Sequence, residues 1–434
     1  MPAAVYLGPM PDTWTHRLSS NPFPGENRTD HPDLGRIPAI LLGLGLFQIV
    51  SMVGSTSLFL VGSLLLVDLT GGAARWAGLP TAVILVSSAV AAWPLASWKG
   101  RIGYRLLLLF SALTGVLGGL VAMVGATLGS IGWIVVACVL VGVANAGIAL
   151  GRYAAAELAP MRGRGRAMSV VMTSSTVGAL GAPVLANLAV ELAKSAGWTA
   201  RPEAGAFALA ALAYALAGIV GSLLVSREPV AIAKLADWKV PEAAPGATPI
   251  EPTGTARLVA SIGSLVFAQM AMVFLMSVTP ADMKHCHHPM GEITAVLTVH
   301  FLGMFGLSFL TGQLVDRFGR LRTIALGSLV LAVSCLLGFA WTDLAGRLVS
   351  LFLLGLGWNF CFLAGSVLVA DALRAGNKAR LQGGADALVA LSSSAASLSA
   401  GLALQSFGFG VLTFVGLALS LAPMGFLVAL RRRG

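Results

Sequence analysis

Residues 312–322 read GQLVDRFGRLR, a short segment in which Asp316, Arg317, Arg320 and Arg322 are charged. It lies between two apolar runs, at about residues 290–314 and 321–341. About 20 consecutive apolar residues are enough to cross a bilayer as a helix. The segment is therefore predicted to be a tight, charged connection between two membrane-spanning helices.

Similar apolar runs recur along the whole chain of 434 residues. Hydrophobic residues make up 57% of the chain and charged residues only 11%, with a mean hydropathy of +0.86. Soluble proteins carry about 25% charged residues. We predict an all-α integral membrane protein with twelve transmembrane helices in two six-helix pseudo-symmetric bundles. The expected spans are 38–66, 76–97, 104–126, 130–153, 166–190, 204–226, 257–279, 290–314, 321–341, 346–370, 381–405 and 408–430.

The net charge of +10 has a topological explanation. With both termini in the cytoplasm, most lysines and arginines fall in the segments predicted to be cytoplasmic. The segments predicted to be external hold only Arg75, Lys194, Arg201, Lys284 and Arg347. An excess of basic residues marks the cytoplasmic side of a membrane protein. We therefore expect a multi-pass membrane protein with both termini inside, and nucleic acid is not an expected partner.

A polar segment divides the chain into two halves that resemble each other. We expect a flexible cytoplasmic tail at 1–36, a six-helix bundle at 37–226, a cytoplasmic linker at 227–256 and a second six-helix bundle at 257–434. LFQIVSM at residues 46–52 is echoed by VFAQMAM at 266–272. Duplicated six-span halves are typical of transporters whose site lies between the repeats.

The segment 312–322 resembles the cytoplasmic loop motif of the major facilitator superfamily, in which an acid caps a helix and arginines face the inner surface. Its counterpart in the first half, residues 100–105, keeps the basic residues but has Gly100 in place of the acid. The resemblance implies the superfamily's fold over essentially the whole chain. It says little about the transported solute.

A set of sulfur and imidazole side chains suggests a path for a metal ion. Met272 and Met276 lie four apart in span 7, as do His300 and Met304 in span 8. Residues four apart share one face of a helix. In an antiparallel hairpin, Met272 and His300 would lie at about the same depth, His300 roughly 15 Å from the start of its span. These donor types favour Cu(I) over hard cations.

The loop before span 8 adds a second candidate set. His285, Cys286, His287 and His288 are consecutive and would lie at the outer mouth. We interpret them as a site that collects copper at the membrane surface. Met272, Met276, His300 and Met304, which we call the Met/His ladder, would then relay the ion inward. An incidental polar loop is the alternative for this set, and packing is the alternative for a methionine pair.

With these pairs, the sequence resembles the CcoA-like copper importers, a branch of the major facilitator superfamily. Their Met-x-x-x-Met and His-x-x-x-Met motifs correspond to Met272/Met276 and His300/Met304. The resemblance implies copper import across a bacterial inner membrane that supplies assembly of cytochrome oxidase. From the donor types the expected cargo is Cu(I), and periplasmic or cytoplasmic copper chaperones are candidate partners. Cys286 resembles a cysteine of that family, but no second thiol lies near span 7. Relatives of the family are also associated with riboflavin uptake.

The alternative interpretation is a transporter of an organic solute such as a flavin or a drug. His300 and the glutamines would then hydrogen-bond the solute. A third possible class is a membrane protein that senses a metal or assists in assembly without transporting a solute. Gln48, Gln269, Asn145 and Asn359 either line a cavity or join neighbouring helices. Asp386 is the best candidate for a proton-coupling carboxylate.

No motif indicates an enzyme, and we expect no resident cofactor. Copper would be the transported substrate. The chain has no phosphate-binding glycine loop and no zinc-protease motif. The expected partners are the copper ion and the lipid bilayer.

Overall fold

The computed structural model has helices in every segment that the apolar runs predict to cross the membrane. Two predicted segments, the tail at 1–36 and most of the linker at 227–256, lie outside the described residues. The structure describes residues 37–71, 76, 79–159, 163–198, 201–225, 255–371 and 378–431.

The first bundle packs around α2 and α3. Its polar and small side chains face inward, and leucines and valines cover the outside, as expected for a surface in contact with lipid tails. Its helices are α2 (Ile37–Leu69), α3 (Leu79–Leu128), α4 (Ile131–Ala149), α5 (Gly151–Glu157), α6 (Arg164–Ser195) and α7 (Ala204–Leu224).

The second bundle packs around α14, which contacts the helices on both sides of it. Its helices are α9 (Thr255–Met276), α10 (Thr279–His285), α11 (Met290–Phe301), α12 (Ser308–Phe318), α13 (Arg320–Ala340), α14 (Leu344–Asp371) and α15 (Lys378–Arg431), with a π-helical turn, η5 (Leu302–Gly306), between α11 and α12. The predicted all-α fold in two six-helix bundles is confirmed.

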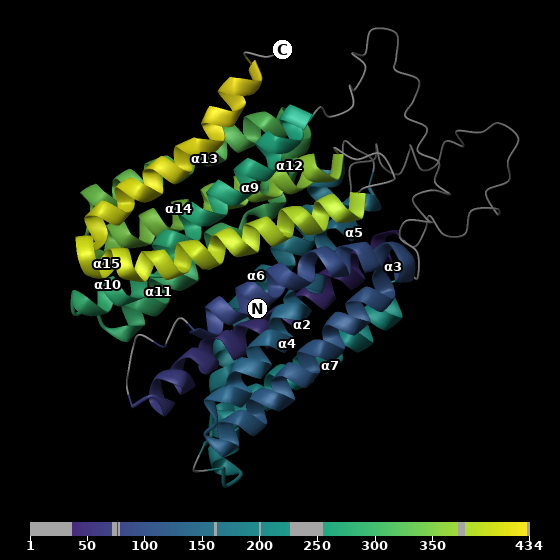
Figure 1. Ribbon diagram of the computed structural model, residues 1–434, viewed down its shortest axis with the longest axis vertical. Coiled ribbons are helices and arrows are strands. Elements are labelled where there is room, and N and C mark those ends of the chain that lie inside the picture. Colours follow the sequence, from purple (N-terminus) through teal and green to yellow (C-terminus); the bar gives the residue numbers. More distant parts are fainter. Residues whose placement is uncertain are drawn as a thin grey trace, which may run out of the picture.

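The two bundles meet along α3 with α15 and along α6 with α12 and η5 (Figure 1). They come together where α5 lies and diverge toward the opposite end, where α10 and α11 lie. We call the first of these the basic end, because α3 bends there beside Lys99 and Arg101, α6 begins there at Arg164 and α13 begins there at Arg320.

Eleven helices among the described residues are long and apolar enough to span a membrane. The remaining expected span, 381–405, is the eleventh along the chain; it forms the first part of α15 but is less apolar than the others. It carries Gln382, Asp386 and the serines at 392–394, and it packs against α3 of the other bundle. Its polar side chains therefore lie between the bundles. They are shielded there from the lipid tails, so this surface need not be apolar.

Span 8 and the loop before it differ from the sequence prediction. The expected span is present as one continuous candidate span, Gly291–Phe318, but it contains the π-helical turn η5, which begins two residues after His300. Such π-helical turns occur often at functional sites. The expected loop at 279–290 contains the short helix α10. Sequence periodicity does not reveal either feature, because both depend on how α14 packs against this region.

Two glycines set the sharp turns of the loop motifs in the two halves. Gly103 has φ 77° and ψ 170°, and Gly319 has φ 91° and ψ 158°. This backbone region is open essentially only to glycine. The motif of 312–322 and its counterpart at 100–105 thus share one backbone geometry, although only the former has an acid.

Replacing Gly319 should destabilise the protein through the backbone alone. No atom lies within 4 Å of a Cβ built at Gly319, so Gly319→Ala causes no clash. The strained φ should lower the free energy of unfolding by about 1–3 kcal/mol. SDS titration of the purified protein measures this change. Gly181→Ala, on a helix and equally free of clashes, is the control and should cause no loss. Equal stability of the two variants would contradict the assignment.

Candidate functional site

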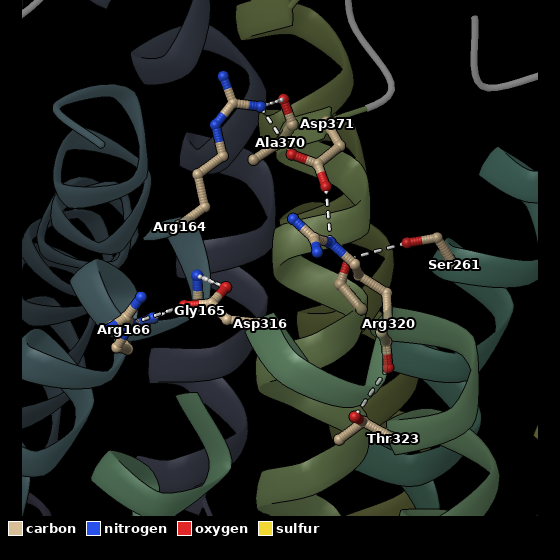
Figure 2. Close-up of polar contacts among 11 residues, drawn as sticks. Arg164, Gly165, Arg166, Ser261, Asp316, Arg320, Thr323, Ala370 and Asp371 are labelled. Carbon is tan, nitrogen blue, oxygen red and sulfur yellow. Dashed lines mark hydrogen bonds and ion pairs between the residues drawn. The ribbon is translucent and has the colours of Figure 1, made fainter. Parts of the chain in front are cut away.

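A charge network joins the two bundles at the basic end (Figure 2). It is formed by Arg164, Gly165 and Arg166 of α6, Asp316 of α12, Arg320 of α13 and Asp371 of α14. The acid of the loop motif thus lies beside a helix of the opposite bundle.

Asp316 caps the N-terminus of α6. Its carboxylate accepts hydrogen bonds from the backbone N–H groups of Gly165 and Arg166, both at 3.0 Å, and from the Arg166 Nε at 3.3 Å. No side chain at Gly163, the residue before the helix, supplies a cap. The first N–H groups of a helix lack internal partners and carry positive partial charge, so a carboxylate stabilises them. The loop motif therefore closes the interface by capping a helix.

Close backbone approach makes this cap possible. A Cβ at Gly312 would lie 2.7 Å from the Gly165 carbonyl oxygen and 2.6 Å from the Ser169 hydroxyl. Larger side chains at this crossing would separate α6 from α12. Asp316 would then no longer reach the first turn of α6.

Asp371 is the second acid of the network and bridges the bundles. It accepts hydrogen bonds from Arg164 at 2.7 Å and from Arg320 at 2.9 Å. Its side chain is only 7% exposed, so water screens these pairs less than pairs at the surface. Arg164 belongs to the first bundle and Arg320 to the second. Rocking of the bundles must therefore break the pair between Arg164 and Asp371.

The first half has a related contact without the capping acid. Lys99 lies 3.3 Å from the Glu157 carboxylate and donates to the Gln382 side chain of α15 at 3.0 Å. Gly383 packs closely against Ala96 of α3. In this half the bundles are joined by a lysine and an amide side chain. Gly100, which stands in the place of the acid, cannot supply a carboxylate.

A buried ion pair crosses between the bundles farther from the basic end. Arg152 of α5 contacts Asp386 of α15, and the Tyr153 hydroxyl lies 3.4 Å from the same carboxylate oxygen. The Arg152 Nε and the second Asp386 oxygen are buried without a hydrogen-bond partner among the described residues. The pair therefore has unused donor and acceptor capacity that points to a further polar partner.

An aromatic cluster lies next to this pair; we use this name for Phe305 of η5 and Trp358 and Phe362 of α14. Trp358 and Phe362 are stacked, with ring centroids 4.6 Å apart and an interplanar angle of 22°. Phe305 meets Trp358 edge to face at 5.7 Å. The Arg152 guanidinium lies 4.9 Å from the Phe362 centroid, and Trp358 Nε1 donates to Gln269.

Sequence reasoning missed the aromatic cluster. The four-residue spacing of Trp358 and Phe362 is visible in the sequence, but such pairs are common in helix packing. The stacked pair lies beside Arg152 of the other bundle, and this contact depends on the tertiary fold. The sequence singles out Asp386 as a candidate coupling carboxylate, and the structure places it beside Arg152.

Most of the other polar residues within spans join helices of one bundle. Ser55 lies 2.7 Å from the side chains of both Asn145 and Tyr214, and Gln48 donates to Ser175 at 3.1 Å. Asn359 donates to the Met304 carbonyl and to Ser308. These contacts favour the helix-joining interpretation of Gln48, Asn145 and Asn359 over a cavity-lining one.

The Met/His ladder is divided between helices that both pack against α14. Met272 and Met276 lie on α9, and His300 and Met304 on α11 and η5. The expected direct hairpin packing of spans 7 and 8 is wrong, because α14 packs extensively against each of them while they pack little against each other. His300 is fully buried, with Nδ1 2.8 Å from the Leu351 carbonyl of α14, and its Nε2 has no hydrogen-bond partner in the part of the chain that the structure describes. Met272 and Met304 are buried as well.

The predicted collecting site lies on and after α10. Cys286 is exposed, His287 has a positive φ of 62°, and the His288 Nδ1 lies 2.7 Å from the Glu292 carboxylate. The side chain of His285 lies outside the described residues. Asp282 of α10 contacts Arg347 of α14, which anchors this short helix to the bundle.

A metal interpretation has no support among the described residues. They contain no group of three or more His, Cys, Asp or Glu side chains arranged to hold a metal ion. A ligand role for Met272, Met276, His300 and Met304, or for residues 285–288, stays a prediction.

Comparison with known proteins gives one consistent picture. The sequence profile described as Major Facilitator Superfamily matches residues 259–433. The chain is 31% identical over 400 residues to "Uncharacterized MFS-type transporter YdeG" of Bacillus subtilis, covering 91% of this chain and 92% of that protein. It is 27% identical over 359 residues to "Riboflavin transporter RfnT" of Brucella anthropi, covering 80% and 85%. The solved structure of the proton:xylose symporter XylE is similar with a TM-score of 0.72 at 17% identity, covering 91% and 96%.

Removing the capping charge should open the basic end. Asp316→Asn removes the negative charge at the α6 N-terminus, and such a charge stabilises a helix end by about 0.3–2 kcal/mol. We expect a larger fraction of molecules with separated bundles. Electron–electron distance measurements between labels at Leu106→Cys and Leu326→Cys, both exposed positions, detect this in a Cys286→Ser background. Arg201→Gln, which breaks an exposed pair with Asp68, is the control. An unchanged distance distribution in Asp316→Asn would exclude the cap as a latch.

Breaking one side of the buried pair should cost more stability than removing both charges. Asp386→Ala leaves Arg152 buried without its acid, which costs about 3–5 kcal/mol in comparable pairs. Arg152→Met with Asp386→Leu replaces both charges by apolar groups and should recover most of that loss. SDS titration measures both variants. Equal losses in the single and the double variant would show that the pair contributes packing only.

Proposed function

The chain belongs to the major facilitator superfamily, and from this premise we propose that it carries a planar organic solute of the flavin class across the membrane by alternating access. The observation that carries the proposal is the stacked pair of Trp358 and Phe362, which lies beside Arg152 of the opposite bundle. The relative named as a riboflavin transporter supports the same solute class.

The aromatic cluster suits a flat, conjugated ring. Aromatic faces stack on planar heterocycles, and this interaction contributes about 1–3 kcal/mol per ring in nucleobase recognition. Phe305 and Phe362 are only partly buried, so their rings have surface left for a ligand. Small inorganic ions gain little from such a surface. A solute with an aromatic ring system fits this cluster better.

The polar groups around the cluster suit the edge of such a ring. A flavin has a carbonyl, an N–H and a second carbonyl in a row along one edge. The Arg152 guanidinium has a buried Nε without a partner and can donate to a carbonyl, while the free oxygen of Asp386 can accept from the N–H. Gln269 can supply a further amide contact. The solute thereby satisfies groups that otherwise remain unpaired.

Solute binding and movement of the bundles are linked by the same residues. Arg152 and Asp386 belong to different bundles, so their pair must separate when the bundles rock. Separation leaves two buried charges without partners, which is costly. A solute that hydrogen-bonds both groups lowers this cost. Binding therefore favours the transition in the manner of a ligand that stabilises a minor state.

The direction of transport follows from the topology that the basic residues favour. With the basic end in the cytoplasm of a bacterial inner membrane, the charge network closes the inner side. The bundles then diverge toward the outside, as Figure 1 shows. Solute enters from outside and is released after the network opens. The proposed direction is therefore uptake.

Copper import, the first interpretation of the Met/His pairs, is less well supported. None of the relatives described above carries a name that refers to copper. The Nδ1–H of His300 donates to the Leu351 carbonyl, and α14 packs against the helices of both pairs. Copper uptake therefore serves as the competing outcome in the transport experiment.

Removing an aromatic ring from the cluster should weaken flavin binding and transport. Trp358→Leu and Phe362→Leu keep apolar bulk but remove the stacking face, so each should raise the riboflavin Kd by about five-fold or more. Tryptophan fluorescence quenching measures binding, and uptake of radiolabelled riboflavin into cells measures transport. Trp133→Leu, at an exposed position on α4, is the matched control.

The same cells distinguish the copper interpretation. Cellular copper is measured by mass spectrometry for the wild type and for His300→Ala. Copper accumulation that is abolished by His300→Ala, together with no riboflavin uptake by the wild type, would reject the flavin proposal and restore the copper one.

A further inference from the structure

A shallow pocket of about 320 Å³ lies at the basic end of the second bundle, apart from the aromatic cluster. It lies where α9 begins, α12 ends and α13 begins. Its lining residues are Arg257, Phe318, Gly319, Arg320, Leu321, Arg322 and Leu368. Three arginines and no acidic residue line it, while the remaining side chains are apolar.

The position of the pocket is that of a membrane surface. Candidate membrane spans begin at Arg257 and Arg320 and end at Phe318. Phe318 is 52% exposed, and Arg257 and Arg322 are exposed. Guanidinium groups beside an exposed aromatic ring at the end of a span combine affinity for phosphate with affinity for the lipid interface.

An exposed apolar stripe continues from the pocket along α13. Leu326, Leu329, Val333 and Leu336 are exposed and follow Arg322 at the spacing of one helix face. A molecule held by its phosphate at Arg322 can therefore lay a hydrocarbon chain along this stripe. A free phosphate ion would make no use of it.

We propose that this pocket binds the headgroup of an anionic phospholipid from the adjacent leaflet, with Arg257 and Arg322 contacting the phosphate. Basic pockets between membrane helices on the cytoplasmic side commonly bind such headgroups. Arg320 lies in the same pocket and also pairs with Asp371 of the charge network. The bound lipid therefore lies directly beside the contact that closes the basic end.

The test compares lipids on the purified full-length protein in detergent. Dioleoylphosphatidylglycerol, dioleoylphosphatidylcholine or inorganic phosphate is added, and the unfolding temperature Tm is followed by tryptophan fluorescence. Phosphatidylglycerol should raise Tm clearly more than phosphatidylcholine, and phosphate should have little effect. The Arg257→Gln/Arg322→Gln variant should lose most of the difference between the two lipids.

A matched variant distinguishes lipid binding in this pocket from nonspecific attraction of anionic lipid to basic residues elsewhere. Arg101→Gln/Arg105→Gln removes two charges from the basic end of the other bundle and should keep the full difference. Native mass spectrometry should show fewer bound phosphatidylglycerol molecules only in the pocket variant. Equal effects of the two lipids on the wild type, an equal gain from phosphate alone, or equal loss in both variants would overturn the proposal.

Discussion

The carboxylate of Asp316 at the first turn of α6 is the contact on which the closed basic end depends. It satisfies two backbone N–H groups of the opposite bundle and meets the positive end of the helix dipole. The cap needs the sharp turn at Gly319 and the close approach of Gly312 to Gly165. Asp371 then adds ion pairs on both sides of the same interface. Backbone geometry, helix packing and charge thus converge on one joint between the two bundles.

The aromatic cluster and the pair of Arg152 and Asp386 extend this joint into the membrane. Charged groups at that depth are costly, and they persist where they have a functional partner. Their unused donor and acceptor atoms lie close to a stacked aromatic pair. Such a combination recognises a ring by its face and by its edge. The charge network joins the bundles at one end of the protein, and we propose that the groups between the bundles recognise the solute.

The Met/His pairs show what four-residue spacing leaves open. Four-residue spacing places Met272 with Met276, and His300 with Met304, on one face of their helices. It does not determine which neighbour that face meets. In the fold, α14 packs against both helices, and its Leu351 carbonyl occupies one nitrogen of His300. The intervening helix α10 also replaces the simple loop on which the hairpin argument depended.

The sequence by itself determined the membrane location, the positions of the spans and the two-bundle fold, because hydropathy and the requirement for internal backbone hydrogen bonds leave few alternatives in lipid. It also identified Asp316, Arg320 and Asp386 as noteworthy, since charges near or within spans are rare. Only the tertiary structure decided that Asp316 caps α6, that Asp386 meets Arg152 and that Phe362 lies beside Arg152. These partners are more than 140 residues apart in the chain or lie on different bundles, and no local pattern encodes such contacts.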